Sequence, residues 1–532
     1  MPSRNFSSRR STRNNGCDAH EGCSVTMSRE IYHTQCADLL VSFGCDVECM
    51  IYVTEDGRHS RHAPKDAPWS YQQSLLHHFI DHGNQKAAVF LIQNGCDVNA
   101  RKIYADNAND DVATPAHLAV TWNQLEVLHE LVVRNADLHA LDSDGRTPCH
   151  VAIRENNEAA VRELLKADDV EFLGLRDRLG HTCLSLAISN KDHTVAKMIV
   201  ERQPHAAVQS NKNGENLLHT SIRQNDFESV LFLLGEAKSD STKPINDGTN
   251  RTPLHLAAIA KNEMIIRNLI LAGGEVNVRA ANGSTPLHEA LRVRNVKNAT
   301  VLLENGADVN MVDEKGDNAL LVAVRCGSPD CIKLLLEDGR VQATVANFND
   351  QTALHLCSLL TVEKLPKRVT SGEIGEILLS NHLYQSTAMS DKDLAQFLDA
   401  KDADGNTALL LAYMNGNAAM CKLLLKRRCC LGSINNDGVN VFTYETATKQ
   451  LLFGLLEWLT EEPRWSDGAI CDCGAKFTLT VRKHHCRHCG RHVCAKCSET
   501  TQPLPKFGEE KKVRLCDLCA HVLSSGGGGG QR

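Results

Sequence analysis

The residues best suited to chemistry in this sequence are eight cysteines near the C-terminus, and they occur as four close pairs. The numbers of residues between successive cysteines are 1, 12, 2, 4, 2, 18 and 2. Paired cysteine thiolates are typical zinc ligands, and eight of them fill two tetrahedral sites. Because sulfur would occupy every position at each ion, we expect two structural zinc ions. The eight residues are Cys471, Cys473, Cys486, Cys489, Cys494, Cys497, Cys516 and Cys519.

We expect the ligands of the two zinc sites to interleave along the chain. The first and third cysteine pairs would then hold one ion, and the second and fourth pairs would hold the other. A module of about 60 residues has too small a core to fold alone, and zinc binding supplies the missing stability. Several cross-braced zinc modules, including RING and PHD domains, share this skeleton.

A basic segment with the sequence RKHHCRHCG, residues 482–490, includes the second cysteine pair. Its histidines are not needed for zinc, because cysteine already fills all eight ligand positions. Arginine can bind two phosphate oxygens at once, and a protonated histidine donates strongly. We therefore predict an anion-binding site made of Arg482, Lys483, His484, His485, Arg487 and Arg514. A solvated basic face is the structural alternative. Nucleic acid is not the expected anion, because stacking aromatics and a basic helix are absent from the segment.

Charge is unevenly divided between this module and the rest of the chain. The 532 residues carry a net charge of −7, yet residues 465–523 hold ten Lys and Arg against six Asp and Glu. The remainder holds 48 basic and 59 acidic residues, a charge of about −11. A basic module on an acidic body indicates an anionic ligand for the C-terminal part only.

The other fourteen cysteines are scattered without regular spacing, as expected of reduced cytosolic thiols. The chain opens without an apolar signal segment, and the apolar run LLFGLLEWL at 451–459 is too short to span a membrane. Residues 1–30 are rich in Ser, Asn and Arg, which predicts a disordered arm. A mitochondrial presequence is the alternative for this arm, but Leu and Ala for an amphipathic helix are missing. These features indicate the cytosol or the nucleus.

A motif recurs through residues 74–413 with a period near 33. The motif reads SLLHHFI at 74, TPAHLAV at 114, TPCHVAI at 147, TCLSLAI at 182, NLLHTSI at 216, TPLHLAA at 252, TPLHEAL at 285, NALLVAV at 318, TALHLCS at 352 and TALLLAY at 407. The motif and its period resemble the ankyrin repeat. Thr caps a helix, and Pro occupies the first turn, where a missing N–H costs little. The fold class that follows is an all-α ankyrin-repeat solenoid with a small C-terminal cross-braced zinc domain.

The predicted organisation assigns 31–445 to about ten ankyrin repeats with degenerate units at the ends. Residues 446–462 are predicted to form a capping or linker helix, 463–523 the zinc module, and 524–532 a Gly-rich tail. One repeat is lengthened by about 22 residues within 364–400. This insertion is either a tolerated surface loop or a partner-binding segment.

The residues between the zinc ligands resemble those of the FYVE domain. RKHHCRHCG, the upstream Trp465 and VRLC at 513–516 carry this resemblance. Ankyrin repeats followed by a C-terminal FYVE domain are the layout of the rabankyrin family. That family carries more repeats and an N-terminal BTB domain, so the sequence corresponds to a fragment, an isoform or an incomplete gene model. The sequence departs from the FYVE pattern at two places. The cysteines of the CDC pair at 471–473 are separated by one residue, where the family has two, and Asp467 lies two positions after Trp465, where the more common FYVE pattern has three.

The resemblance implies recognition of phosphatidylinositol 3-phosphate on early endosomes by a cytoplasmic, peripheral membrane protein. It implies that Asp467 accepts hydrogen bonds from inositol hydroxyls, and that Leu479 and Thr480 enter the membrane. It also implies that the ankyrin face binds proteins, among them an early-endosomal Rab GTPase, in endosome fusion or macropinocytosis. The expected protein is a non-enzymatic adaptor.

Two other functions compete with the adaptor. The first is a ubiquitin ligase, since ankyrin arrays also occur with RING domains, although a histidine ligand and an apolar groove for an E2 enzyme are not recognisable in the sequence. The second is a FYVE-like module that binds proteins without binding lipid. The sequence leaves open which proteins bind the ankyrin face, what the insertion does and whether the chain oligomerises.

Overall fold

A computed structural model describes residues 50–54, 59–60, 69–104, 113–380, 391–445, 450–466, 470–471 and 473–525. The predicted arm at 1–30 lies outside these residues, as do 381–390 of the insertion and 526–532 of the tail. The chain divides into two compact units, Met1–Ala206 and Ala207–Arg532.

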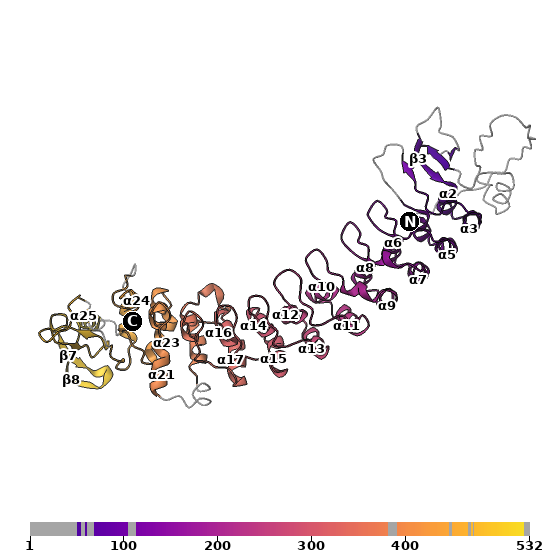
Figure 1. Cartoon of the computed structure of the whole chain (residues 1–532). Helices are drawn as coiled ribbons and strands as arrows, with labels where there is room; N and C mark the ends of the chain where they lie inside the picture. The colour runs from indigo at the N-terminus through magenta and orange to yellow at the C-terminus, as the bar shows by residue number, and fades with distance from the viewer. Residues whose placement is uncertain are drawn as a thin grey trace, which may run out of the picture. The chain divides into compact units, whose positions relative to one another are not determined.

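The first unit is built from pairs of short antiparallel helices that stack in two layers (Figure 1). The first helices of successive pairs contact one another, and so do the second helices. The pairs are α2 (Leu75–Asp81) with α3 (Gln85–Gln93), α4 (Pro115–Thr121) with α5 (Leu125–Val133), α6 (Pro148–Arg154) with α7 (Glu158–Leu164), and α8 (Cys183–Ser189) with α9 (His193–Arg202). A 3₁₀ turn, η1 (Glu171–Gly174), connects α7 with α8.

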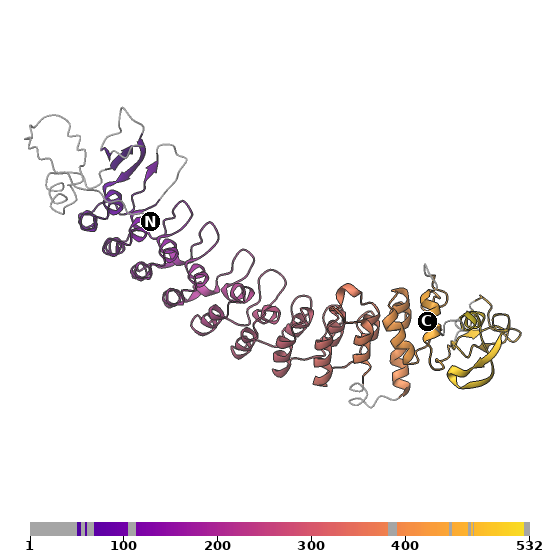
Figure 2. The ribbon, with the colours of Figure 1, turned by 180° about the vertical axis from the view of Figure 1, so that it is seen from behind.

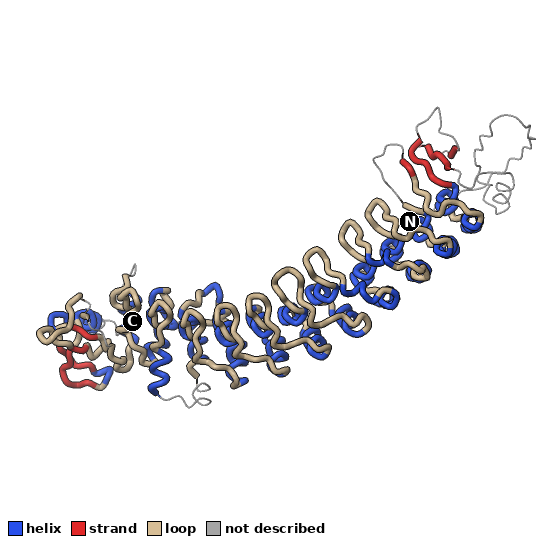
Figure 3. Tube along the Cα trace, in the orientation of Figure 1, coloured by secondary structure: helices blue, strands red, loops and turns tan. Residues whose placement is uncertain are grey.

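The first unit also contains an antiparallel sheet, which the expected all-α array does not include; three of its strands precede α2, and the fourth lies between α3 and α4. Its strands are drawn in red near the N label (Figure 3). The strand order is β2-β1-β3-β4, and Tyr52 lies opposite both Ser60 and Gln72. The segments MIYVT and WSYQQS are rich in β-branched and aromatic residues, which favour strands. The strands are β1 (Met50–Thr54), β2 (His59–Ser60), β3 (Trp69–Ser74) and β4 (Ile103–Tyr104).

The second unit, taken by itself, is also built from helix pairs that stack in two layers (Figure 2). Its pairs are α10 (Leu217–Arg223) with α11 (Phe227–Gly235), α12 (Pro253–Ile259) with α13 (Glu263–Leu271), α14 (Pro286–Arg292) with α15 (Val296–Glu304), α16 (Ala319–Arg325) with α17 (Pro329–Asp338), α18 (Ala353–Ser358) with α19 (Ser371–Leu378), and α22 (Ala408–Met414) with α23 (Ala418–Lys426). The turn η2 (Pro204–Val208) spans the division between the units, and η3 (Val362–Lys364) follows α18.

The TPLH motif both starts a helix and ties one repeat to the next. At α14 the Thr285 hydroxyl accepts the backbone N–H of His288, whose Nδ1 accepts the backbone N–H of Thr285 at 3.1 Å. This reciprocal pair is a capping box with histidine as its second member. In the preceding repeat, His255 donates from Nε2 to the carbonyl oxygen of Ser284 at 3.0 Å. Burial lowers the pKa of His288 to about 4 and also lowers the pKa of His255, so both rings are neutral.

The insertion is accommodated without breaking the stack. Twelve residues, 359–370, separate α18 from α19, whereas three residues separate α14 from α15. Further extra residues follow α19 and include the helix α21 (Asp391–Leu398). The helices α18 and α22 still contact each other, as do α19 and α23. A groove of about 930 Å³ lies between α17 and α19 and is lined by insertion residues Pro366 and Val369.

The array is followed by α24 (Gln450–Trp458), which contacts α23 on one side and the C-terminal helix on the other. Its buried residues are Leu452, Leu455 and Leu456. The helix is shorter than the predicted 446–462, of which 446–449 lie outside the described residues. Residues 459–462 are not helical, and Pro463 disfavours a helical conformation of the residue before it.

Two small antiparallel sheets and one helix form the zinc module. His484 and His485 of β5 pair with Val493 and His492 of β6, and β7 pairs with β8. The elements are β5 (His484–His485), β6 (His492–Val493), η4 (Ala495–Cys497), β7 (Thr501–Leu504), η5 (Pro505–Phe507), β8 (Glu509–Arg514) and α25 (Asp517–Ser525). The helix α25 extends into the range predicted as tail.

Candidate functional site

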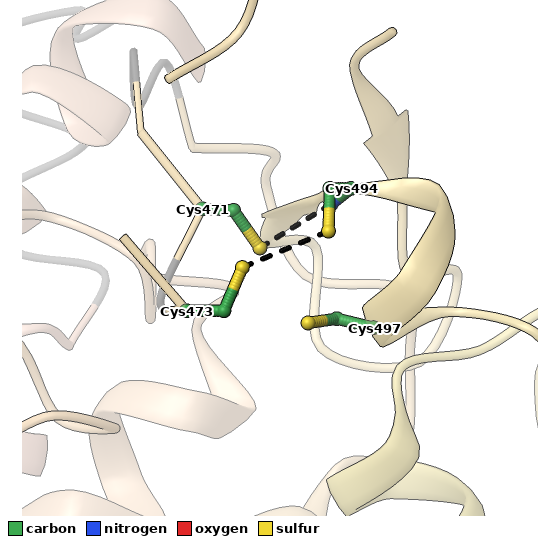
Figure 4. Close-up of side chains that lie close together, drawn as sticks. All are labelled: Cys471, Cys473, Cys494 and Cys497. Carbon is green, nitrogen blue, oxygen red and sulfur yellow. Dashed lines mark hydrogen bonds between the residues drawn. The ribbon is translucent and has the colours of Figure 1, made fainter. Parts of the chain in front are cut away.

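The first and third cysteine pairs come together in one cluster (Figure 4). The Sγ atoms of Cys471, Cys473, Cys494 and Cys497 all lie within 4.8 Å of one another. The Sγ of Cys473 is 3.7 Å from the Sγ of Cys494, whose backbone N–H donates to the Sγ of Cys471 at 3.3 Å. Cys473 is exposed, and a backbone hydrogen bond from Ala475 is the main reason that its pKa is lowered to about 7.

The second and fourth cysteine pairs form another cluster, which is buried throughout. The Sγ atoms of Cys489 and Cys516 are 3.9 Å apart, and the backbone N–H of Cys519 donates to the Sγ of Cys516 at 3.4 Å. Hydrogen bonds from the other thiols, that of Cys486 first, hold the pKa of Cys516 far below its usual range. The thiolate form, which binds metal, is thereby favoured at this position.

The geometry of both clusters fits zinc. A tetrahedron with Zn–S bonds of about 2.3 Å has edges of about 3.8 Å. The separations of 3.7 Å between Cys473 and Cys494, and of 3.9 Å between Cys489 and Cys516, match that edge. The two clusters are the groups that interleaved ligation requires, and the short CDC pair does not prevent the first group from assembling. The module therefore holds two sulfur-only sites that fit structural zinc ions.

The basic segment, residues 482–490, contains β5 and the first two cysteines of the second cluster, Cys486 and Cys489. Arg482 and Lys483 are exposed, and His484 and His485 are half-buried on the strand. Partial burial, followed by the positive charges of Arg514 and Arg482, lowers the pKa of His484. These three side chains therefore share one positive region, in which an anion would be stabilised.

Arg487 and Arg514 are joined through the backbone, because the N–H of Arg487 donates to the carbonyl oxygen of Arg514 at 3.1 Å. The guanidinium of Arg487 lies over the ring of Trp465, 4.8 Å from its centroid, and Nη1 is 3.3 Å from Oε1 of Glu462. The Nη1 of Arg514 donates to the carbonyl oxygen of Ser498 at 2.7 Å.

The loop before the basic segment carries an isolated apolar side chain. Leu479 is fully exposed, and its neighbour Thr480 is exposed as well. The loop is a tight turn in which the N–H of Thr478 donates to the carbonyl oxygen of Val481 at 3.1 Å. Both residues predicted to enter a membrane thus lie on one ordered loop. Asp467, the predicted partner of inositol hydroxyls, lies outside the described residues.

The zinc module packs against the last ankyrin elements through contacts that local sequence patterns do not predict. Arg491 lies over the ring of Phe442 at 4.3 Å and donates from Nη2 to the Sγ of Cys516 at 3.0 Å. Lys506 donates to the carbonyl oxygen of Leu456 at the end of α24 at 3.3 Å. A basic residue directly after RKHHCRHCG was visible in the sequence, but its partner lies 49 residues earlier. Only the fold brings such residues together.

None of the helices in the described part of the chain combines the length and the apolar character needed to span a bilayer.

Comparison with protein families matches residues 465–525 to the FYVE zinc finger. Ankyrin repeat families match 102–173, 239–313, 302–365 and 404–436. The predicted fold class, ankyrin repeats followed by a FYVE zinc finger, is confirmed.

Among curated proteins, Rabankyrin-5 of Mus musculus is 42% identical over 493 residues, which are 92% of this chain and 39% of the mouse protein. Rabankyrin-5 of Homo sapiens is 43% identical over 470 residues, covering 86% of this chain and 38% of the human protein. The chain therefore spans about two fifths of the length of these relatives. Hepatocyte growth factor-regulated tyrosine kinase substrate of Drosophila melanogaster is 51% identical over 71 residues, 13% of this chain and 9% of its own length. The predicted resemblance to the rabankyrin family is confirmed over most of the chain.

Proposed function

We propose that this rabankyrin homologue, with its ankyrin repeats and C-terminal FYVE zinc finger, is a non-enzymatic adaptor on endosomal membranes. Its zinc module would bind phosphatidylinositol 3-phosphate, and its ankyrin repeats would bind proteins. An early-endosomal Rab GTPase is the first of these partners, by the resemblance to rabankyrins. The proposed location is the cytoplasmic face of early endosomes, in fusion or macropinocytosis.

The observation that carries the lipid proposal is the pairing of an exposed apolar tip with a basic segment on the same small module. Leu479 is fully exposed and lies three residues before Arg482. A membrane has the complementary arrangement, because apolar chains lie beneath anionic headgroups. Basic residues near such a surface contribute about 1 kcal/mol each, and insertion of the leucine adds an apolar contribution.

Different residues of the zinc module would contact the lipid phosphate and hold the binding site in place. Arg482, Lys483 and Arg487 offer cationic donors to the phosphate, and the two histidines of β5 add further ring N–H donors. The two zinc ions would hold β5 and the Leu479 loop in fixed positions, so that little conformational entropy is lost on binding. Arg514 completes the positive region through its backbone contact with Arg487.

Flotation of the full chain with vesicles tests the lipid proposal. We expect recovery with phosphatidylcholine vesicles that contain phosphatidylinositol 3-phosphate, and little recovery with vesicles that contain phosphatidylinositol. The double variant Arg482→Ala with His484→Ala should lose most of this binding. Lys496→Ala is the matched control, because Lys496 is an exposed cation of the same module outside the basic segment. Unchanged recovery of the double variant would favour a FYVE-like module that binds only proteins.

A further inference from the structure

A carboxylate, that of Glu462, lies beside the basic segment. Glu462 belongs to the linker between α24 and the zinc module. Its Oε1 lies 3.3 Å from Nη1 of Arg487 and accepts the indole N–H of Trp465 at 3.0 Å. We propose that Glu462 is an intramolecular competitor that occupies Arg487 and weakens the binding of a phosphate there. This inference rests on the proposed function of the same site.

The contacts of Arg487 explain how the carboxylate of Glu462 can affect phosphate binding. Its guanidinium lies over the face of Trp465 and contacts the carboxylate of Glu462, and its backbone N–H donates to the carbonyl oxygen of Arg514. The ring of His485 also lies against Trp465, with 4.0 Å between the ring centroids and a tilt of 30°. Arg487, His485 and Trp465 therefore form one packed group. An anion that binds at Nη1 of Arg487 therefore meets the carboxylate of Glu462.

The linker that carries Glu462 contacts both the ankyrin part and the zinc module. Arg464 makes an ion pair with Asp399 at 3.1 Å and donates from Nε to the carbonyl oxygen of Arg428 at 2.8 Å. Glu461, the neighbour of Glu462, makes an ion pair with Arg428. Both partners belong to the ankyrin part of the chain, so the linker is anchored to the last repeat.

The other side of the linker is anchored to the zinc module. The backbone N–H of Ser466 donates to the carbonyl oxygen of Gly490 at 3.0 Å. A side chain at Gly490 would place its Cβ 2.7 Å from the carbonyl oxygen of Arg464, and the φ of Gly490 is +71°. Glycine is therefore required here for the close approach of the linker. With both ends fixed, the carboxylate of Glu462 stays within reach of Arg487.

The charges and exposure of Arg487 and Glu462 indicate that a phosphate can compete with the carboxylate for Arg487, so that the ion pair does not block the site permanently. The side chains of Arg487 and Glu462 are 41% and 39% exposed, so water can replace either partner. Ion pairs between side chains as exposed as these are weak, so a bound phosphate can displace the carboxylate. The carboxylate also repels a phosphate held at the same guanidinium. Removing its charge should therefore tighten lipid binding moderately.

The test compares Glu462→Gln with Glu461→Gln in the full chain. Both variants remove one negative charge from neighbouring positions, but only Glu462 contacts Arg487, whereas Glu461 contacts Arg428. Glutamine at 462 can still accept the Trp465 indole N–H. Affinity is measured by titrating phosphatidylcholine vesicles that contain either phosphatidylinositol 3-phosphate or phosphatidylinositol, at low and high salt. The zinc content of each variant confirms that the module is folded.

We expect Glu462→Gln to bind the phosphorylated lipid about two- to fivefold more tightly than the wild type, and Glu461→Gln to bind like the wild type. The gain should shrink at high salt, which screens exposed charges. Equal affinity of the wild type and Glu462→Gln, or an equal gain in both variants, would overturn the role of Glu462 and leave the proposed function standing. If neither the wild type nor Glu462→Gln distinguished the two vesicles, the proposed function would fall as well.

Discussion

The ankyrin repeats of the second unit and the zinc module derive their stability from different sources. The single helix pair α14 and α15 buries seven aliphatic side chains, which are Leu287, Ala290, Leu291, Ala299, Val301, Leu302 and Leu303. Among the described residues of the module, the buried aliphatic side chains are Val493, Leu504, Leu515 and Val522. The module has about twice the length of one repeat, yet its described residues bury fewer aliphatic side chains than this one helix pair. Metal ligation must supply what its core lacks.

The two cysteine clusters extend this contrast inside the module. All four cysteines of the second cluster are buried, and Arg491 connects this cluster with Phe442 of the ankyrin part. The first cluster includes the exposed Cys473 and lies close in sequence to the Leu479 loop. The second cluster is therefore the core of the module, and the first cluster supports the Leu479 loop, which we propose to contact lipid.

The largest predicted effect is a difference in zinc content and folding between variants that lack one ligand of either cluster. Cys519→Ser removes a buried ligand, and we expect this variant to lose both zinc ions and the fold of the module, since structural zinc contributes on the order of 10 kcal/mol. Cys473→Ser removes an exposed ligand, and we expect it to retain one zinc ion and most of the fold. Zinc stoichiometry by elemental analysis, with amide hydrogen exchange over residues 463–525, measures both effects.

In both variants the ankyrin helices should remain folded, because each repeat contacts only its neighbours. Equal zinc loss in Cys519→Ser and Cys473→Ser would show that the two clusters form a single cooperative unit and would remove the distinction between them.

A smaller predicted effect concerns the repeats and their response to acid. Burial lowers the pKa of His288 to about 4, so the folded state keeps this ring neutral. The unfolded chain binds a proton below about pH 6.5, and the stability that His288 contributes is therefore present above pH 6.5 and lost as the pH falls toward 4. The expected loss is about 1.4 kcal/mol per pH unit within this window.

His288→Gln is the matched variant, because glutamine can also occupy the third position of a capping box and does not titrate. Chemical denaturation at pH 7 and pH 5, followed by far-ultraviolet circular dichroism, should reveal a smaller acid sensitivity in His288→Gln than in the wild type. The same loss in both proteins would assign the acid response to other groups.

The sequence predicted the structure best where the role of a residue depends on its spacing from near neighbours in the chain. TPLH at 252 and 285 predicted helix starts, and eight paired cysteines predicted two groups of four sulfur ligands, because capping and ligation depend on local spacing. The β1–β4 sheet was missed, since its short strands lie within a range whose repeat pattern suggested helices. The contacts of Glu462 with Arg487 and of Arg464 with Asp399 were also missed. They join residues 25 and 65 positions apart, and only the packing of the linker brings them together.

The binding of the full chain to vesicles that differ only in one phosphoinositide tests the central claim most directly. The vesicles would carry equal amounts of phosphatidylinositol 3-phosphate, phosphatidylinositol 4-phosphate or phosphatidylinositol 5-phosphate, so that their surface charge is the same. The account predicts a clear preference for the 3-phosphate, because fixed donors on β5 and at Arg487 read the position of the phosphate as well as its charge. Equal binding to all three lipids would reduce the basic segment to an unspecific cationic surface and contradict the account.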